Sequence, residues 1–142
     1  MKKLAIILAV IVVTGCSTAN NYPQENIAKV SLDWPGLYQG IFPCADCEAI
    51  GVSLTLNDND TFKLERTYKK GKWLSTPQAT VGKFTWNTVK PLIYLPEDGT
   101  MLTFFVGEGY VTAYAIDGNR IESNLNFTLT KVPANNENTQ AK

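Results

Sequence analysis

The chain has 142 residues, with 13 basic and 13 acidic side chains and no histidine. This balanced charge provides no electrostatic footprint for nucleic acid, so no nucleic-acid partner is expected. The lack of histidine excludes a closed zinc site built from Cys and His and removes the usual general base of a hydrolase, so no enzymatic activity is predicted.

Residues 1–15 are predicted to be a secretory signal peptide. Lys2 and Lys3 precede an apolar run over residues 4–13, and two small residues then lead to Cys16. A positive start, an apolar centre and a small-residue exit are the three parts of such a signal. The apolar run is too short for a membrane-spanning helix, which takes roughly 17 to 25 residues.

The tetrad Val13, Thr14, Gly15 and Cys16 resembles the bacterial lipobox, in which the cysteine receives a diacylglycerol thioether before cleavage. The alternative is an ordinary cleaved signal with an incidental cysteine. Two or three acyl chains, such as palmitate, give effectively permanent anchoring, because each buried methylene contributes about 0.8 kcal/mol. We therefore expect lipidation of Cys16 and a membrane partner. Ser17, rather than Asp, follows the cysteine, which favours sorting to the outer membrane with the domain in the periplasm or at the cell surface.

Residues 16–31 read as a lipidated N-terminus followed by a polar tether, because they lack hydrophobic periodicity. Residues 133–142 contain no large apolar side chain and are predicted to be a disordered tail. About 100 residues remain between them, enough for one modest core. We therefore expect a single domain over residues 32–132.

The domain is predicted to be all-β. Val52, Leu54 and Leu56 alternate with polar residues, as a half-buried strand requires. No stretch shows a convincing helical stripe. Similar alternation or β-branched and aromatic enrichment marks the other expected strands, which together cover residues 37–42, 52–57, 61–65, 80–86, 92–95, 101–106, 110–116 and 124–130.

Short turn signals separate these strands, at residues 57–60, 98–99, 107–109 and 117–119. Short turns join neighbouring strands antiparallel and favour a meander, which hides its edges best by closing into a small barrel. A barrel of about eight strands is either filled by its own side chains or holds one small ligand. Both alternatives stay open from the sequence.

Cys44 and Cys47, in the run PCADCE, are the chemically distinctive residues. After export to an oxidising compartment a disulfide between them is the default, and i and i+3 of a tight turn lie close enough to form it. Three roles remain open: a structural brace, a redox switch, or a soft-metal site. Two thiolates could hold Cu(I) only when reduced. No cofactor is required, and copper is the one cofactor considered.

The run from Pro43 to Ile50, PCADCEAI, resembles the PCADCxGI signature of the NlpE family, lipoproteins often named for copper resistance or copper homeostasis. Ala49 replaces the family's usual Gly. Further similarity extends over about residues 34–132, including the lead-in at 37–41, the strand residues 53–56, Thr61, Phe62 and Tyr68, the Gly82 and Trp86 strand, and the ending Ile121, Glu122, Ser123, Leu125, Asn126 and Phe127.

This resemblance implies a lipocalin-like antiparallel barrel, a non-enzymatic outer-membrane lipoprotein, and a part in envelope stress signalling to a sensor kinase and in copper tolerance. A different hypothesis is a carrier of a small apolar ligand. In that case the barrel mouth would be lined by Trp73, Trp86, Phe104, Phe105, Tyr110 and Tyr114.

Overall fold

Strands dominate residues 25–134, the part of the chain that the computed structural model describes. The predicted signal peptide and Cys16 lie outside these residues, so their roles stay predictions. The elements in chain order are α1 (Ile27–Ser31), β1 (Gly36–Phe42), β2 (Ala49–Leu56), β3 (Thr61–Lys70), β4 (Trp73–Leu74), β5 (Gln78–Lys83), β6 (Thr85–Trp86), β7 (Leu92–Glu97), β8 (Thr100–Gly107), β9 (Tyr110–Tyr114) and β10 (Thr128–Lys131). The all-β prediction is confirmed.

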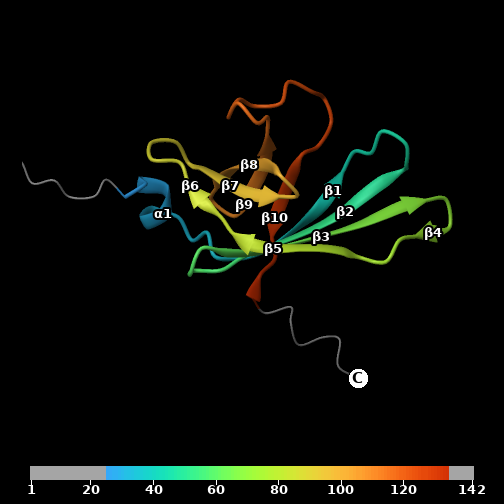
Figure 1. Cartoon of the computed structure of the whole chain (residues 1–142), viewed down its shortest axis with the longest axis horizontal. Coiled ribbons are helices and arrows are strands. Elements are labelled where there is room, and N and C mark those ends of the chain that lie inside the picture. Colours follow the sequence, from blue (N-terminus) through green and yellow to red (C-terminus); the bar gives the residue numbers. More distant parts are fainter. Residues whose placement is uncertain (1–24, 135–142) are drawn as a thin grey trace, which may run out of the picture.

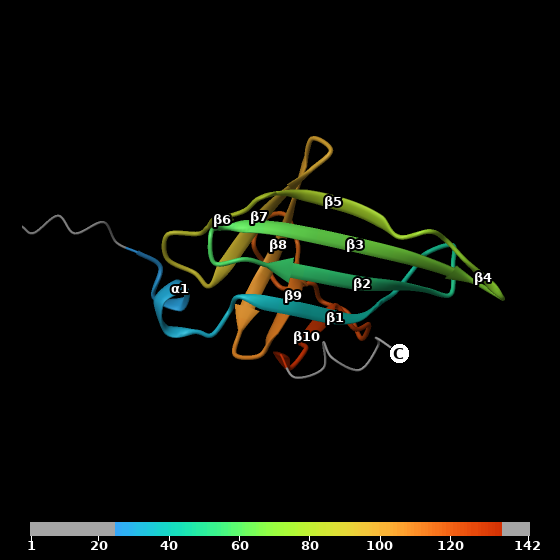
Figure 2. The same cartoon turned by 90° about the horizontal axis from the view of Figure 1, so that it is seen from below.

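All the strands pair antiparallel in one sheet, in the order β4-β3-β2-β1-β10-β9-β8-β7-β6, with β5 also pairing with β3. The sheet curls around a single core (Figures 1 and 2). The predicted antiparallel meander is therefore confirmed and its shape is barrel-like. Backbone pairing does not complete the ring within the described residues. On one side of the opening β5 pairs with β3, on the other β6 pairs with β7, and β5 pairs with neither β6 nor β7.

The two outer edges of the sheet meet at Phe84, the single residue between β5 and β6. Its backbone N donates to the carbonyl of Asp60 at 2.9 Å, and its side chain is 2% exposed. The sequence predicts one continuous strand over residues 80–86. The structure instead divides it, because the chain changes its pairing partner at Phe84.

Three inward-facing polar side chains, Arg66 of β3, Thr80 of β5 and Glu97 of β7, bridge the open seam; we call them the seam triad. Both guanidinium Nη atoms of Arg66 donate to the Glu97 carboxylate, at 2.6 and 2.7 Å. The Thr80 hydroxyl donates to the same carboxylate at 2.9 Å. The seam triad thus replaces a missing backbone ladder between β5 and β7 with charge-assisted hydrogen bonds.

The core lies inside the curled sheet and consists of apolar side chains at alternate strand positions. On β2, Val52, Leu54 and Leu56 are buried, as their period of two predicts. Tyr38 is also fully buried; its hydroxyl donates to the carbonyl of Trp34 at 2.6 Å, and burial raises its pKa to about 12. The other buried members of this core are Trp34, Phe62, Leu64, Phe84, Ile93, Leu95, Phe104, Val106, Val111 and Leu129.

One end of the barrel is plugged by aromatic rings. Trp34 packs edge-to-face against Phe84 and Trp86, with ring centroids 5.7 and 5.4 Å apart. Helix α1 lies at this same end, opposite the β3–β4 hairpin (Figure 1). Because α1 has five residues, it falls far short of the length and apolarity needed to cross a membrane, and no other helix in residues 25–134 qualifies.

The structured domain begins earlier than residue 32, within the segment expected to be a tether. Asn26 is 5% exposed; its side chain accepts from the backbone N of Ala28 and donates to the carbonyls of Asn87 and Lys90, at 2.5 and 2.6 Å. Asn26 therefore caps α1 and also fastens it to the β6–β7 loop. A helix this short leaves no hydrophobic stripe in the sequence, so periodicity gives no sign of it.

The ending of the domain also differs from the prediction. The alternation of Leu125, Phe127 and Leu129 predicts a strand over residues 124–130. In the structure β10 begins only at Thr128, Leu129 is fully buried, and Leu125 is 60% exposed. Residues 115–127 form a long connection from β9 to β10, closed locally by the bridge between Tyr114 and Arg120.

Candidate functional site

The two cysteines lie on the loop of residues 43–48 that joins β1 to β2. These strands stay paired as far as Phe42 and Ile50, so the loop must turn within a short span. Cys44 and Cys47 are joined by a disulfide, with Cα atoms 5.2 Å apart. This spacing lies within the range that a disulfide accepts, and the expected disulfide is confirmed.

Glu48 fastens this loop to the turn between β3 and β4. Its backbone N donates to the carbonyl of Lys69 at 2.9 Å, and its carboxylate accepts from the backbone N of Gly71 at 2.9 Å and pairs with the Lys69 ammonium at 3.2 Å. The hydrogen bonds from Lys69 and Gly71 lower the pKa of Glu48 below its ordinary value. The cysteine loop is thus braced twice, by the disulfide and by Glu48.

Whether this loop can bind copper depends on the donor atoms that it provides. Cu(I) prefers thiolate sulfur, but the sulfurs of Cys44 and Cys47 are bonded to each other. No group of three or more His, Cys, Asp or Glu side chains gathers among residues 25–134 in a way that could hold a metal ion. The oxidised loop therefore does not fit copper. Only reduction would provide two thiolates.

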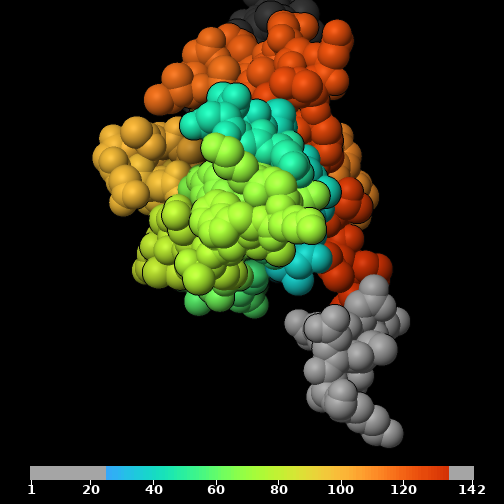
Figure 3. All heavy atoms as spheres, turned by 90° about the vertical axis from the view of Figure 1, so that its right-hand side faces the viewer, coloured from blue at the N-terminus to red at the C-terminus, as the bar shows by residue number. Residues whose placement is uncertain are grey.

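Beside the cysteine loop, the long connection of residues 115–127 approaches the end of β1. The rings of Phe42 and Phe127 meet edge-to-face with centroids 6.0 Å apart, and the Asn126 amide donates to the carbonyl of Ile41 at 3.5 Å. Figure 3 views this end of the molecule, where the β1–β2 loop (cyan) lies between the β3–β4 hairpin (green) and the 115–127 connection (orange).

A cavity of about 340 Å³ lies between these segments and the inner face of the sheet. We call it the mouth cavity. Among residues 25–134, Arg66 of the seam triad is the only charged side chain that lines it. Its lining consists of Phe42, Val52, Leu64, Arg66, Met101, Leu102, Thr103, Phe104, Ala113, Tyr114, Ile116, Ile121 and Phe127.

The structure separates the aromatic side chains that the sequence groups at a barrel mouth. Phe104 and Tyr114 do line the mouth cavity. Trp86 packs at the opposite, plugged end. The remaining three line no part of the mouth cavity: Trp73 on β4 is 60% exposed, and Phe105 stacks on Tyr110 and Tyr114, with centroids 6.2 and 5.4 Å apart.

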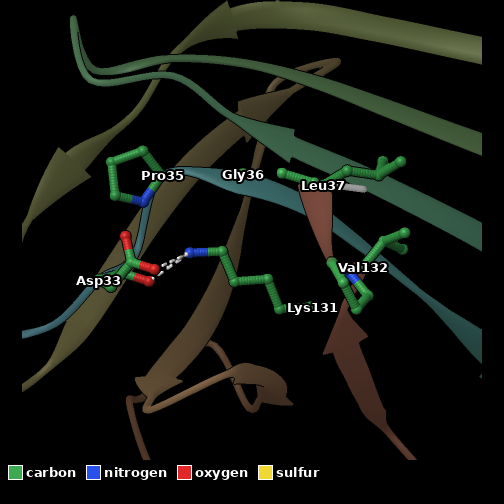
Figure 4. A pocket seen from close by; sticks show the side chains of 8 residues that line it. Asp33, Pro35, Gly36, Leu37, Lys131 and Val132 are labelled. Atoms are coloured by element: carbon green, nitrogen blue, oxygen red, sulfur yellow. Dashed lines mark hydrogen bonds and ion pairs between the residues drawn. The ribbon is translucent and has the colours of Figure 1, made fainter. Parts of the chain in front are cut away.

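A second hollow, of about 530 Å³, lies where β1 begins and β10 ends. Figure 4 shows Lys131 reaching across it toward Asp33. The Lys131 ammonium binds both the carboxylate and the carbonyl oxygen of Asp33, at 2.7 and 2.6 Å. Because its charged groups already neutralise each other, this hollow is a weaker candidate for ligand binding than the mouth cavity.

Comparisons with known proteins agree on one family. The family model described as the NlpE N-terminal domain matches residues 38–124. Lipoprotein NlpE from Escherichia coli strain K12 is 27% identical in an alignment of 137 residues that covers 91% of this chain and 57% of that protein. The chain therefore spans little more than half the length of this relative.

Two crystal structures are similar in fold. A protein from Shewanella oneidensis, described as a lipoprotein, is 38% identical with a TM-score of 0.65, over 73% of this chain and 94% of that one. The second structure, named as the Cpx pathway activator NlpE from Escherichia coli, is 25% identical with a TM-score of 0.54, over 71% of this chain and 53% of that one. The residues that the family model matches, 38–124, include the cysteine loop and most of the sheet.

Proposed function

The chain belongs to the NlpE family, and from this membership we propose that it is a non-enzymatic, outer-membrane lipoprotein that takes part in envelope stress sensing and signals to a sensor kinase. The observation that carries the proposal is the family match across residues 38–124, which includes both cysteines, most of β1 and all of β2 to β9. The 25% identical relative of known structure is named a Cpx pathway activator. Signalling of the same type is proposed for this chain.

The cysteine loop is the surface we propose for partner contact. It projects at the end of the domain away from α1 (Figure 1). Ala45, Asp46 and Glu48 are exposed on it, and the disulfide together with the Glu48 contacts holds its backbone in one conformation. A braced loop loses little conformational entropy on binding, which favours recognition by another protein.

Lipidation of Cys16 would place α1 toward the membrane. Only residues 17–24 separate Cys16 from the first described residue. Even fully extended, those residues span at most about 30 Å, at roughly 3.3 to 3.6 Å each. Because α1 is at the opposite end from the cysteine loop, this arrangement would direct the loop away from the anchoring membrane.

A signalling experiment tests the proposal. The chain is produced in E. coli cells that lack their own NlpE and carry a transcriptional reporter of the Cpx pathway. We expect reporter activity to rise with the amount of this chain. A loop variant, Ala45→Glu with Asp46→Lys, changes the exposed surface of the cysteine loop but keeps the disulfide and Glu48. We expect this variant to give a lower reporter response than the parent chain. No response to the parent chain at any level would contradict the proposal.

The role in copper tolerance is proposed to be indirect, through the stress response rather than through copper bound at the loop. The support is the donor set, since the cysteine sulfurs form a disulfide. Cells that carry the Cys44→Ser, Cys47→Ser double variant should then show the same change in copper tolerance as in stress-reporter activity. Copper sensitivity with a normal stress response would contradict this proposal and favour direct binding by reduced cysteines.

A further inference from the structure

Side chains fill one end of the barrel and leave a cavity at the other. At the α1 end, Trp34 and Phe84 are 4% and 2% exposed, and their rings fill the space between the strands. At the other end no comparable plug is present among the described residues, and the mouth cavity takes its place. The sheet therefore leaves an apolar space that its own side chains do not fill.

Apolar side chains at the rim of the mouth cavity remain in contact with water. Ile116 is 75% exposed and Met101 is 42% exposed. Phe42, Leu102 and Phe127 are half-buried, although they contribute to the cavity wall. An apolar molecule in the cavity would remove part of this surface from water, which is the driving force of such binding.

The polar part of the mouth cavity is electrically neutral. Arg66 is the only charged side chain that lines it in the described part of the chain, and the Glu97 carboxylate binds Arg66 through both oxygens. A guanidinium has five N–H groups, and these contacts engage two of them. Arg66 therefore offers donors to an acceptor oxygen in the cavity, whereas Glu97 opposes a second negative charge nearby.

We propose that the mouth cavity binds one small, uncharged molecule that has a single apolar chain and a hydrogen-bond-accepting oxygen, such as a medium-chain alcohol or its ester. The volume of about 340 Å³ is near the lower limit of ligand pockets, roughly 300 to 1,000 Å³, so a lipid with two acyl chains does not fit. The oxygen lies toward Arg66, and the chain lies along Leu64, Phe104 and Ala113. This site is independent of the proposed signalling function.

The chain from Ser17 onward is suitable for the test, because the Shewanella relative crystallised as a chain 94% of which matches this domain. The probe is phenylnaphthylamine, an uncharged dye whose fluorescence rises in apolar surroundings. It is displaced by decanol, decanoate or decyltrimethylammonium, which share one chain length and differ in charge. We expect decanol to displace the dye at concentrations lower by about tenfold or more, because burying an unpaired charge beside a neutral ion pair is costly.

Two variants locate the binding site. Ala113→Trp and, separately, Ile121→Trp place a ring in the mouth cavity from a strand and from the 115–127 connection. Each should weaken decanol binding by about tenfold or more, since filled space excludes the chain. Ala79→Trp, at an exposed position on β5, is the matched control and should bind as the parent does. Circular dichroism identifies any variant that fails to fold.

Three results would overturn the inference. Decanoate or the ammonium compound could displace the dye as well as decanol, both filling variants could fold and still bind decanol normally, or the parent could bind neither dye nor decanol. None of these results depends on reporter activity in cells. The ligand proposal and the signalling proposal therefore succeed or fail separately.

Discussion

The seam triad makes a quantitative prediction about how the open barrel is held together. The side chains of Arg66 and Glu97 are 24% and 14% exposed. Their pair therefore lies between surface ion pairs, worth about 0 to 1 kcal/mol, and fully buried ones, whose disruption costs about 3 to 5 kcal/mol. Glu97→Gln keeps the side-chain shape but removes the charge. We expect it to lower the free energy of unfolding by about 2 kcal/mol, and hence the Tm by roughly 10 °C.

The same variant should change how stability depends on pH. Hydrogen bonds from Arg66, followed by that from Thr80, lower the pKa of Glu97 despite its partial burial. A carboxyl group with a lowered folded-state pKa contributes stability that is complete above its unfolded pKa, about 4.3, and is lost as the pH falls through the folded value. The parent should therefore lose more stability than Glu97→Gln between about pH 5 and about pH 3.

Thermal unfolding followed by circular dichroism at several pH values provides the measurement. Glu65→Gln is the matched control, because Glu65 pairs with Lys63 at 2.9 Å on the outer face, where the side chains are 34% and 49% exposed. This control should cost less than about 0.5 kcal/mol. Equal losses in the two variants would refute the argument that burial across the seam makes the triad important.

Three further predictions concern the ends of the domain and its cysteines. Cells fed a clickable fatty acid should label the parent chain but not Cys16→Ser, and equal labelling would contradict lipidation. Alkylation of unreduced protein taken from the envelope should modify neither Cys44 nor Cys47 by mass spectrometry, whereas modification of both would show that the pair is reduced in the cell. Asn26→Ala removes a helix cap and the donor to two loop carbonyls, so it should lower the free energy of unfolding by about 1 to 3 kcal/mol. Denaturant titration provides this measurement, and an unchanged value would mean that Asn26 does not hold α1 to the β6–β7 loop.

The sequence was sufficient for the strands whose alternation reflects burial on one face. Val52, Leu54 and Leu56 alternate because one side of β2 faces the core, and no distant contact is needed to see it. The Asp98 and Gly99 turn is similar: both residues have positive φ, 44° and 81°, as a two-residue hairpin turn of type I′ requires. Both features depend on residues that are neighbours in the sequence, so the order of apolar, polar and turn residues is enough to predict them.

Features set by distant partners could not be predicted in the same way. The break at Phe84 exists because β5 and β6 pair with strands far apart in the sheet. Leu125 continues an alternating pattern but has no core to face, because β10 begins only at Thr128. The mouth cavity likewise depends on β1, β2, β3, β8 and β9 meeting one loop. The cysteine pair was visible in advance because its spacing of three residues is itself local.

The small size of the disulfide loop determines how a redox signal could be read from this domain. A ring closed by a separation of three residues contributes at most about 2 kcal/mol by restricting the unfolded chain. The Glu48 contacts with Lys69 and Gly71 do not depend on the bond. Reduction should therefore loosen residues 43–48 and leave the barrel folded. We expect dithiothreitol to lower the Tm by no more than about 10 °C while protease cleavage within the loop increases.

The Cys44→Ser, Cys47→Ser variant is the control for this measurement, because it has no bond to reduce and its cleavage should not respond to dithiothreitol. A collapse of the whole far-ultraviolet circular dichroism signal on reduction would contradict the reasoning, since it would make the disulfide a condition for folding. For signalling, a change confined to the cysteine loop is more useful than unfolding of the whole domain. The loop lies at the exposed end of a stable barrel, so a partner could distinguish its oxidised and reduced forms without the domain unfolding.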